Sequence, residues 1–483
     1  MNVAVVLLLS FELLAAATTN FFCSGSSDAE YEAYEGSKLF GRKKLPWKNL
    51  EYLDLRSNLL EGPVAVPPPS LKVFLISNNK FTGEIPQLIC NTSNIEVLDL
   101  SNNSLSGTIP ECIGNFSNTL QVLDLRMNRF HGTIPATFAK GNNLKTLNFN
   151  GNELVGTVPR SLLNCKNLEV LDLGNNKIND TFPSWLGALP ELQVLVLRSN
   201  KFYGFLRDHD SNYSFSKLRI IDISNNEFSG AFPAKYFENL KAMMNTGEAA
   251  ERKLQYMGRI NYYENSVTLT IKRFEVKLEK ILTIFTTIDF SNNSFHGKIP
   301  ELIGKLHSLH FLNLSQNILQ GNIPSSLGNL TILESLDLSS NQLDGEIPWQ
   351  LRSLTFLAVL NLSHNKLRGP IPQGNQFATF SSDSYNGNLG LCGFPLSNNC
   401  STNEPAQTVS SSEDNTESEN GFGWKIVLMG YGCGTVFGII MGYTVISKGK
   451  LQWLVSIVEG EHHRKKRQNK KRKMKMTVHA STL

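Results

Sequence analysis

A row of acidic and amide side chains recurs along the chain and is the first candidate for chemistry. Its members are Asp54, Asp99, Asp124, Asn148, Asp172, Asp222, Asp289, Asn313, Asp337 and Asn361. The residue two positions later varies more, and three of these later positions hold arginine: Arg56, Arg126 and Arg198. Guanidinium groups bind carboxylates and other acceptors through charge-assisted hydrogen bonds. We expect the acidic row to be a solvated surface feature and the three arginines to be candidate ligand contacts.

No grouping of side chains predicts catalysis. The nine histidines are scattered, and His462 and His463 belong to a basic tail. Neither a glycine-rich phosphate loop nor a His/Cys spacing typical of a metal site occurs. We therefore predict that the protein is not an enzyme and uses no cofactor and no metal.

The elements that position the acidic row are the units of a repeat. Its fullest copy, Ile95 to Pro110, reads Ile-x-x-Leu-Asp-Leu-Ser-Asn-Asn-Ser-Leu-Ser-Gly-Thr-Ile-Pro. One marker asparagine identifies each of twelve copies: Asn58, Asn79, Asn103, Asn128, Asn152, Asn176, Asn200, Asn226, Asn293, Asn317, Asn341 and Asn365. Seven of the eleven steps between them are 24 residues. This period with this motif predicts a leucine-rich repeat solenoid, an α/β repeat fold whose short strands form a parallel sheet on the concave face.

The residue types explain the pattern. Alternate side chains of the Leu-x-Leu step point inward, and the marker asparagine satisfies backbone groups of its turn and of the neighbouring coil. The glycine permits a bend, and the Ile-Pro step fixes an extended backbone. Because no repeat buries its core alone, stability comes from stacking. Leucines and marker asparagines are therefore structural, and function is expected on the outward strand positions.

One insertion interrupts the repeat. The step from Asn226 to Asn293 is 67 residues long, which places an island of inserted residues at 239–281. The island carries Tyr256, Tyr262 and Tyr263, and the alternation from Val267 to Ile271 predicts a strand. Long insertions in repeat arrays are often functional. We expect the island to take part in recognition, with a hinge or spacer as the alternative.

A membrane span is predicted near the C-terminus. The run from Ile426 to Ile446 is uncharged, and 21 residues of helix span roughly 30 Å. Gly430, Gly434, Gly438 and Gly442 recur every fourth residue, which favours helix packing against a partner. Acidic residues precede the run and basic residues follow it. The positive-inside rule then predicts a single-pass plasma-membrane protein with an extracellular N-terminus. The basic tail is expected to attract anionic lipids rather than nucleic acid.

Three features resemble plant leucine-rich-repeat receptor-like proteins, including the Cf-type disease-resistance receptors. They are the Gly-x-Ile-Pro repeat, the island four repeats before the end, and the closing run from Asn386 to Gly393. The resemblance covers about residues 45–475 and implies the plant-specific solenoid type. It also implies that the concave face and island bind an extracellular peptide, protein or glycan, and that a separate receptor kinase transmits the signal, in defence.

The resemblance also singles out residues in the island. The family's island carries a tyrosine, eight residues and then Lys-Gly; this chain has Tyr263 and Lys272 at that spacing, with Arg273 in place of the glycine. The candidate ligand-binding residues are Arg56, Arg126, Arg198, Tyr262, Tyr263 and Lys272. Two other readings remain open: a membrane-tethered inhibitor or scaffold that binds secreted enzymes, and a non-signalling fragment or decoy.

Cysteines and sequons fit an extracellular location. Cys392 and Cys400 follow the last repeat and are expected to form a disulfide, and Cys90 and Cys112 on adjacent coils form a second candidate pair. Ten Asn-x-Ser/Thr sequons are candidate glycosylation sites: Asn91, Asn102, Asn115, Asn179, Asn212, Asn292, Asn313, Asn329, Asn361 and Asn399.

The expected organisation follows from these segments. Val3 to Leu14, followed by three alanines, resembles a signal peptide, but paired cap cysteines are not found in the next segment, so we expect an N-terminally shortened member of the family. The predicted parts are a signal peptide at 1–17, a non-repeat segment at 18–44, repeats at 45–238, the island at 239–281, repeats at 282–380, a C-terminal cap at 381–402, an acidic juxtamembrane linker at 403–423, a transmembrane helix at 424–446 and a basic cytoplasmic tail at 447–483.

Overall fold

The computed structural model describes residues 20–21, 34–35, 45, 48–116, 119–206, 214–232, 234–244, 256–257, 260, 262–272 and 274–400. The predicted signal peptide, the transmembrane helix with its four glycines, the basic tail and the Asn212 sequon lie outside these residues. Within them, no helix has the length and apolar character needed to cross a membrane.

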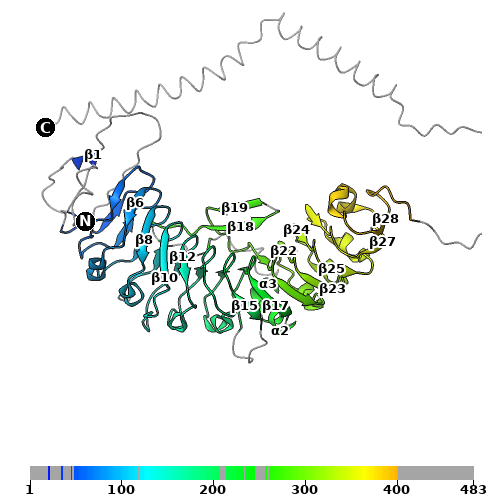
Figure 1. Ribbon diagram of the computed structural model, residues 1–483, viewed down its shortest axis with the longest axis horizontal. Coiled ribbons are helices and arrows are strands. Elements are labelled where there is room, and N and C mark those ends of the chain that lie inside the picture. The colour runs from blue at the N-terminus through cyan, green and yellow to red at the C-terminus, as the bar shows by residue number, and fades with distance from the viewer. Residues whose placement is uncertain are drawn as a thin grey trace, which may run out of the picture. The chain divides into compact units, whose positions relative to one another are not determined.

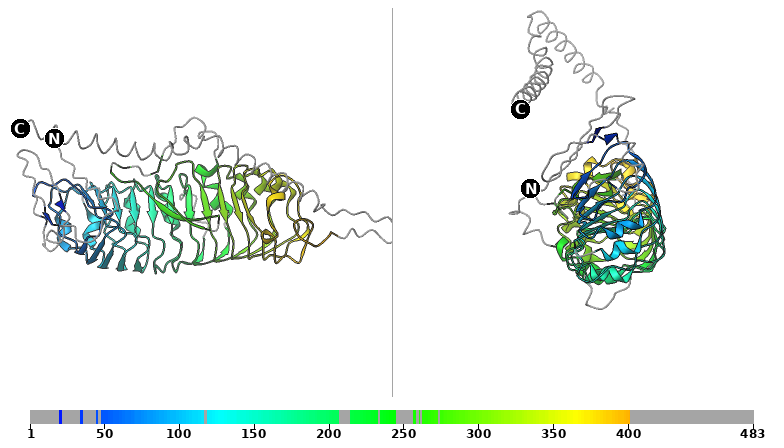
Figure 2. Two further views of the ribbon diagram at one scale, coloured as in Figure 1. Left: turned by 90° about the horizontal axis from the view of Figure 1, so that it is seen from above. Right: turned by 90° about the vertical axis from the view of Figure 1, so that its left-hand side faces the viewer.

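Twelve parallel strands form one continuous sheet on the inner side of the solenoid (Figure 1). They are β3 (Tyr52–Asp54), β5 (Val73–Leu75), β7 (Val97–Asp99), β9 (Val122–Asp124), β11 (Thr146–Asn148), β13 (Val170–Asp172), β14 (Val194–Val196), β16 (Ile220–Asp222), β20 (Thr287–Asp289), β22 (Phe311–Asn313), β24 (Ser335–Asp337) and β26 (Val359–Asn361). Each pairs in register with the next coil, as Leu147 does with Leu171. Figure 2 shows the coils stacked one after another along a single axis. The predicted leucine-rich repeat solenoid with its concave parallel sheet is confirmed.

A second strand in most coils forms two five-stranded parallel sheets outside the first. One contains β4 (Glu61–Pro63), β6 (Lys80–Gly83), β8 (Ser104–Thr108), β10 (Arg129–Thr133) and β12 (Glu153–Val155). The other contains β15 (Tyr203–Phe205), β17 (Glu227–Ala231), β21 (Ser294–Gly297), β23 (Ile318–Asn322) and β25 (Gln342–Asp344). The glycine of the repeat lets the backbone bend within these second strands, since Gly107 in β8 has a positive φ of 82°.

Short 3-10 helices complete the coils: η1 (Gln87–Asn91), η2 (Glu111–Asn115), η3 (Arg160–Asn164), η4 (Ser184–Ala188), η5 (Glu301–Lys305), η6 (Ser325–Asn329), η7 (Trp349–Ser353) and η8 (Asn375–Thr379). The proline of the Ile-Pro step precedes most of them, and Pro324 is extended with φ of −64°. Within the described residues, the only α-helical turns are α2 (Ala234–Glu238) and α3 (Lys241–Met244).

Marker asparagines join neighbouring coils as expected. Asn317 donates from Nδ2 to three carbonyls, those of Phe290, Leu314 and Ser315, at 3.0–3.2 Å. Its Oδ1 accepts the Phe295 N–H at 3.0 Å. The C-terminal cap repeats this arrangement with Asn388, which donates to Leu362 and accepts from Leu367. The cap therefore ends the solenoid by imitating one more repeat, which the marker pattern did not reveal.

The C-terminal cap is folded onto the last repeat, and both candidate cysteine pairs form disulfides. In the cap, β28 (Gly390–Cys392) pairs with β27 (Arg368–Pro370), and η9 (Ser382–Ser384) precedes the fully buried Tyr385. Cys392 and Cys400 form a disulfide with Cα atoms 5.0 Å apart. Cys90 and Cys112 form another, at 5.7 Å. Near the N-terminus, β1 (Asn20–Phe21) pairs antiparallel with β2 (Tyr34–Glu35).

The island begins later than the sequence indicated. Leu240 and Met243 are buried in the solenoid core, and the Met243 carbonyl accepts the Ser308 N–H of the next coil. Residues up to 244 therefore complete a coil, because their apolar side chains fill the position that 3-10 helices fill elsewhere. The predicted strand at Val267–Ile271 is confirmed as β18, which pairs antiparallel with β19 (Phe274–Leu278).

Candidate functional site

The island does not project away from the solenoid but packs against its concave face. Island side chains Met257, Val267, Leu269 and Ile281 are buried against four apolar residues of the central strands: Val170, Val194, Val196 and Ile220. Burying such side chains contributes roughly 1.5–3 kcal/mol each relative to exposure. The hairpin of β18 and β19 therefore lies inside the curve of the solenoid (Figure 1).

A polar contact fixes the island to the N-terminal half of the sheet. The Tyr263 side chain is only 3 % exposed, and its hydroxyl donates to Asp124 Oδ2 at 2.7 Å. Arg126 Nε lies 3.5 Å from the same carboxylate oxygen, and Arg126 Nη1 donates to Ser266 Oγ at 2.6 Å. Because the carboxylate is fully buried, these donors supply the interactions that water would otherwise provide.

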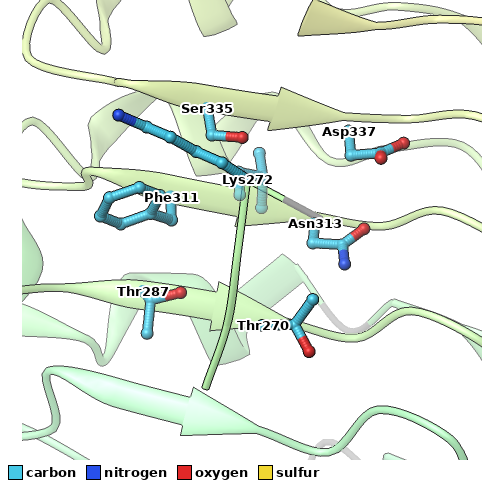
Figure 3. A pocket seen from close by; sticks show the side chains of 8 residues that line it. Thr270, Lys272, Thr287, Phe311, Asn313, Ser335 and Asp337 are labelled. Carbon is cyan, nitrogen blue, oxygen red and sulfur yellow. The ribbon is translucent and has the colours of Figure 1, made fainter. Parts of the chain in front are cut away.

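The hairpin makes two further charged contacts with the sheet. Arg198, after β14, pairs with Glu275 of β19. Lys272, in the turn of the hairpin, pairs with Glu334 at 3.0 Å, and its Nζ lies 6.0 Å from the centre of the Phe311 ring. A small hollow lies beneath this turn, and Figure 3 shows Phe311, Asn313 and Ser335 on the strands that floor it. With the ring contact between Tyr262 and Tyr52 of β3 at its other end, the island spans the sheet from β3 to β24.

The acidic row is buried, so the prediction of a solvated row is wrong. Asp124 and Asp222 are fully buried, and Asp99, Asp172 and Asp289 are nearly so. Burial raises the pKa of Asp124 and of Asp172 to about 6, and it also raises the pKa of Asp222 and Asp289. Desolvation is the cause of these rises, and the hydrogen bonds that the carboxylates accept from neighbouring side chains and backbone N–H groups oppose it.

Amide members of the row pair with the carboxylate members on the last coils. Asn313 Nδ2 donates to Asp289 Oδ2 at 3.2 Å, and Asn361 Nδ2 donates to Asp337 Oδ2 at 3.0 Å. The row is therefore an internal hydrogen-bonded ladder across the coils. Its alternation of acid and amide on the last coils is a structural feature, because each amide donates to the carboxylate of the coil before it.

The six candidate ligand-binding residues fall into three groups. Tyr263 and Arg126 meet at Asp124, while Arg198 and Lys272 bind the hairpin to the sheet. At the other end of the island, Tyr262 is 60 % exposed, and its ring lies edge-on to Tyr52, 4.8 Å between centroids. Arg56 pairs with Asp54 of the same strand at 2.8 Å. Five of the six therefore lie at the island–sheet interface, all but Arg56, and a ligand role for any of them stays a prediction.

The candidate glycosylation sites also differ in exposure. Six are exposed: Asn91, Asn115, Asn179, Asn292, Asn329 and Asn399. Asn102 and Asn313 are partly buried. Asn361 is buried and donates to Asp337, so a glycan there is incompatible with this fold. Sequons within the strand motif arise from the repeat itself, which explains why the sequence pattern included them.

The sequence reasoning missed the strand position that receives the island. This position directly precedes the Leu-x-Leu step. It is apolar in most coils, as at Val73, Val170, Val194 and Ile220. Outward valine and isoleucine on a surface strand are unusual in solvent and indicate a covering segment. A comparison of this column among coils was the signal that could have placed the island.

Models of leucine-rich repeats match the chain in both halves. One, described as "Leucine rich repeat", matches residues 118–178 and 158–202. A second, "Leucine Rich Repeat", matches six single repeats: 70–92, 94–116, 285–306, 308–330, 333–354 and 356–377.

Similar curated proteins come from Arabidopsis thaliana. Receptor-like protein 7 is 55 % identical over 86 % of this chain and 43 % of its own length, and receptor-like protein 33 is 46 % identical over 86 % and 47 %. The chain thus spans about half the length of the curated relatives it matches. The resemblance to plant receptor-like proteins is confirmed.

Solved ectodomains share the fold. The plant peptide hormone receptor RGFR1 in complex with RGF2 superposes with a TM-score of 0.56 at 27 % identity, covering 71 % of this chain and 52 % of the receptor chain. The PEPR1–AtPEP1 complex also gives 0.56, at 29 % identity, with coverage of 71 % and 46 %. The ectodomain of the Arabidopsis thaliana receptor kinase GASSHO1/SCHENGEN3, in complex with CASPARIAN STRIP INTEGRITY FACTOR 2, gives 0.53 at 28 % identity, with coverage of 73 % and 43 %.

Proposed function

We propose that this leucine-rich-repeat chain, which is similar to plant receptor-like proteins, is a cell-surface receptor subunit. It binds an extracellular peptide through its concave side and signals by associating with a separate receptor kinase, in plant defence. The observation that carries the proposal is the twelve-stranded concave sheet with an island bound across it. Support comes from the relatives' name and from the peptides in the solved complexes of the same fold.

The signalling part of the proposal rests on the C-terminal sequence. The glycine-spaced run from Ile426 to Ile446 makes the chain a single-pass protein of the plasma membrane, with the solenoid outside. Glycines on one helix face allow a second helix to approach closely. A receptor kinase with its own span is the partner that this face would bind, because an anchor alone needs no packing surface.

The test is recovery of a receptor kinase with the full-length tagged chain from plant membranes. Gly434→Ile and Gly438→Ile together should abolish recovery, because isoleucine holds a partner helix away. Gly432→Ile is the matched control, since it adds the same side chain about 200° around the helix from Gly434.

Equal kinase recovery from all three forms, or none from the unmodified chain at the cell surface, would contradict the receptor proposal. The second outcome would instead favour a tethered inhibitor or a decoy.

A further inference from the structure

The outer edge of the island hairpin has hydrogen-bonding groups that point away from its partner strand. Ile271 pairs with Phe274 across a two-residue turn, so this pair and the Leu269–Val276 pair exchange hydrogen bonds. The pairs between them, Thr270–Glu275 and Thr268–Lys277, do not. The N–H and C=O groups of Glu275 and Lys277 therefore point outward from β19.

In the part of the chain that the structure describes, these outward groups have no main-chain partner. Among the described residues, the main-chain N–H and C=O of Glu275 and Lys277 make no bond to another segment. The side chains along the edge are open as well: Phe274 is 73 % exposed, the Glu275 side chain 65 % and the Lys277 side chain 46 %. Figure 1 shows β19 on the side of the hairpin that faces away from the solenoid.

An open edge of this kind is a template for one more strand. Edge strands pair with extended segments through main-chain hydrogen bonds, and side chains along the edge supply specificity. A two-stranded hairpin is marginally stable and gains from a third strand. Phe274, Val276 and Leu278 line one face of β19, while Glu275 and Lys277 line the other. The added strand would therefore meet an apolar face and a face with one charge of each sign.

We propose that an extended peptide binds by pairing with the outer edge of β19, forming a third strand of the island sheet. The inference rests on the proposed function, because it specifies how the ligand of that receptor is bound. The peptide that this edge prefers carries apolar residues at alternate positions and charged residues between them. The hairpin lies within the arc of the solenoid (Figure 1), so a narrow peptide can reach this edge, whereas a second solenoid with an equally recessed hairpin cannot.

The experiment uses a random dodecapeptide phage library, selected against the full-length chain. Recovered peptides are synthesised and measured against three forms of the chain: unmodified, Lys277→Ala and Lys277→Pro. Proline removes the outward N–H of residue 277, and proline is tolerated on edge strands. Alanine removes the same side chain but keeps the N–H, so the pair separates the main-chain bond from the lysine charge.

The expected result is that Lys277→Pro weakens binding about two- to tenfold relative to Lys277→Ala, which corresponds to the loss of one main-chain hydrogen bond. A second measurement needs no variant chain. Single N-methyl groups placed along the peptide should weaken binding to the unmodified chain at alternate positions, because only alternate N–H groups face β19.

Three outcomes would overturn the inference. The first is equal peptide binding to the proline and alanine forms, with N-methyl groups that show no alternating effect along the peptide. The chain would then still bind a peptide, but at a site other than the edge of β19. Self-association of the full chain that Lys277→Pro abolishes would assign the edge to a second copy. Recovery of no peptide from the library would overturn both this inference and the peptide class of the proposed ligand.

Discussion

Each marker asparagine from Asn79 to Asn365 connects its own coil to the coil before it. One amide group serves a main-chain N–H and several carbonyls, so it replaces the water that the narrow turn excludes. Leucine at these positions would fill the space but leave the backbone groups unsatisfied. The chemistry that recurs from repeat to repeat is therefore hydrogen bonding at the turn as much as leucine packing.

Asn317→Ala should destabilise the solenoid by about 2–4 kcal/mol, because it leaves a buried N–H and several carbonyls without partners. The change would be measured as a lower urea midpoint of the purified full chain. Asn322→Ala is the control, since Asn322 is exposed at the end of β23. Equal midpoints for the two variants would contradict the role assigned to the marker asparagine.

Tyr263→Phe should loosen the island without unfolding the solenoid. The variant removes the hydroxyl that donates to the buried Asp124, at a cost of about 1–2 kcal/mol. Proteolytic cleavage within the island should then become roughly 5–30 times faster. Tyr262→Phe, one residue away on an exposed ring, should cleave at the unmodified rate. Similar rates for both variants would show that the Asp124 contact does not fix the island.

At the scale of elements, the island and the sheet beneath it form one packed unit. Burial within this unit changes the pKa values of the sheet's carboxylates. Covering the acidic row removes its carboxylates from water, and desolvation favours their neutral form. Burial therefore raises the pKa of four members of the row: Asp124, Asp172, Asp222 and Asp289.

This burial predicts that acidic pH stabilises the solenoid. The pKa of Asp172 is raised to about 6 in the folded chain from an ordinary value of 3.8, so the folded state holds a proton that the unfolded state has lost. The corresponding stabilisation is fully present below pH 3.8 and is lost as pH rises through about 6, a total of up to about 3 kcal/mol. Asp172→Asn should remove this contribution.

The measurement is the urea midpoint of the full chain and of Asp172→Asn at several pH values between 4 and 7.5. The free energy of unfolding of the unmodified chain should fall relative to that of Asp172→Asn as the pH rises. A difference that stays constant across the range would contradict the raised pKa of Asp172.

The sequence predicted the repeats more completely than it predicted the island. Repeat positions are fixed by local alternation and by contacts between adjacent coils, so the marker asparagines and leucines could be read one coil at a time. The packing of Val267 and Leu269 on Val170 and Val194 joins segments about a hundred residues apart, and no local pattern encodes it. The contact that covers Asp124 is of the same long-range kind, because Tyr263 lies 139 residues further along the chain.

At the scale of the whole molecule, the described part of the solenoid presents different faces to solvent. Island residues contact the concave side from β3 to β24. Most exposed sequons instead lie on the 3-10 helices or other outer segments, as Asn91, Asn115 and Asn329 do. A ligand on the concave side therefore meets the island first, and glycans on the helices do not cover that approach.

Glycopeptide mapping of the full chain from plant cells should find glycans at exposed sequons such as Asn91, Asn115 and Asn329. It should find none at Asn361, because that side chain is buried and donates to Asp337. Asn329 and Asn361 are only 32 residues apart in the same chain, so they experience the same cellular conditions. A glycan on Asn361 in folded, surface-delivered protein would contradict the packing of β24 against β26.

The central claim is that the island is bound to the concave face, so that its outer side is the surface offered to a ligand. Hydrogen–deuterium exchange of the intact full-length chain tests this most directly. The amides of Leu269 and Val276, which pair within the hairpin, should exchange slowly, on a timescale approaching that of the concave strands. Exchange within seconds, as for an unstructured loop, would contradict the claim.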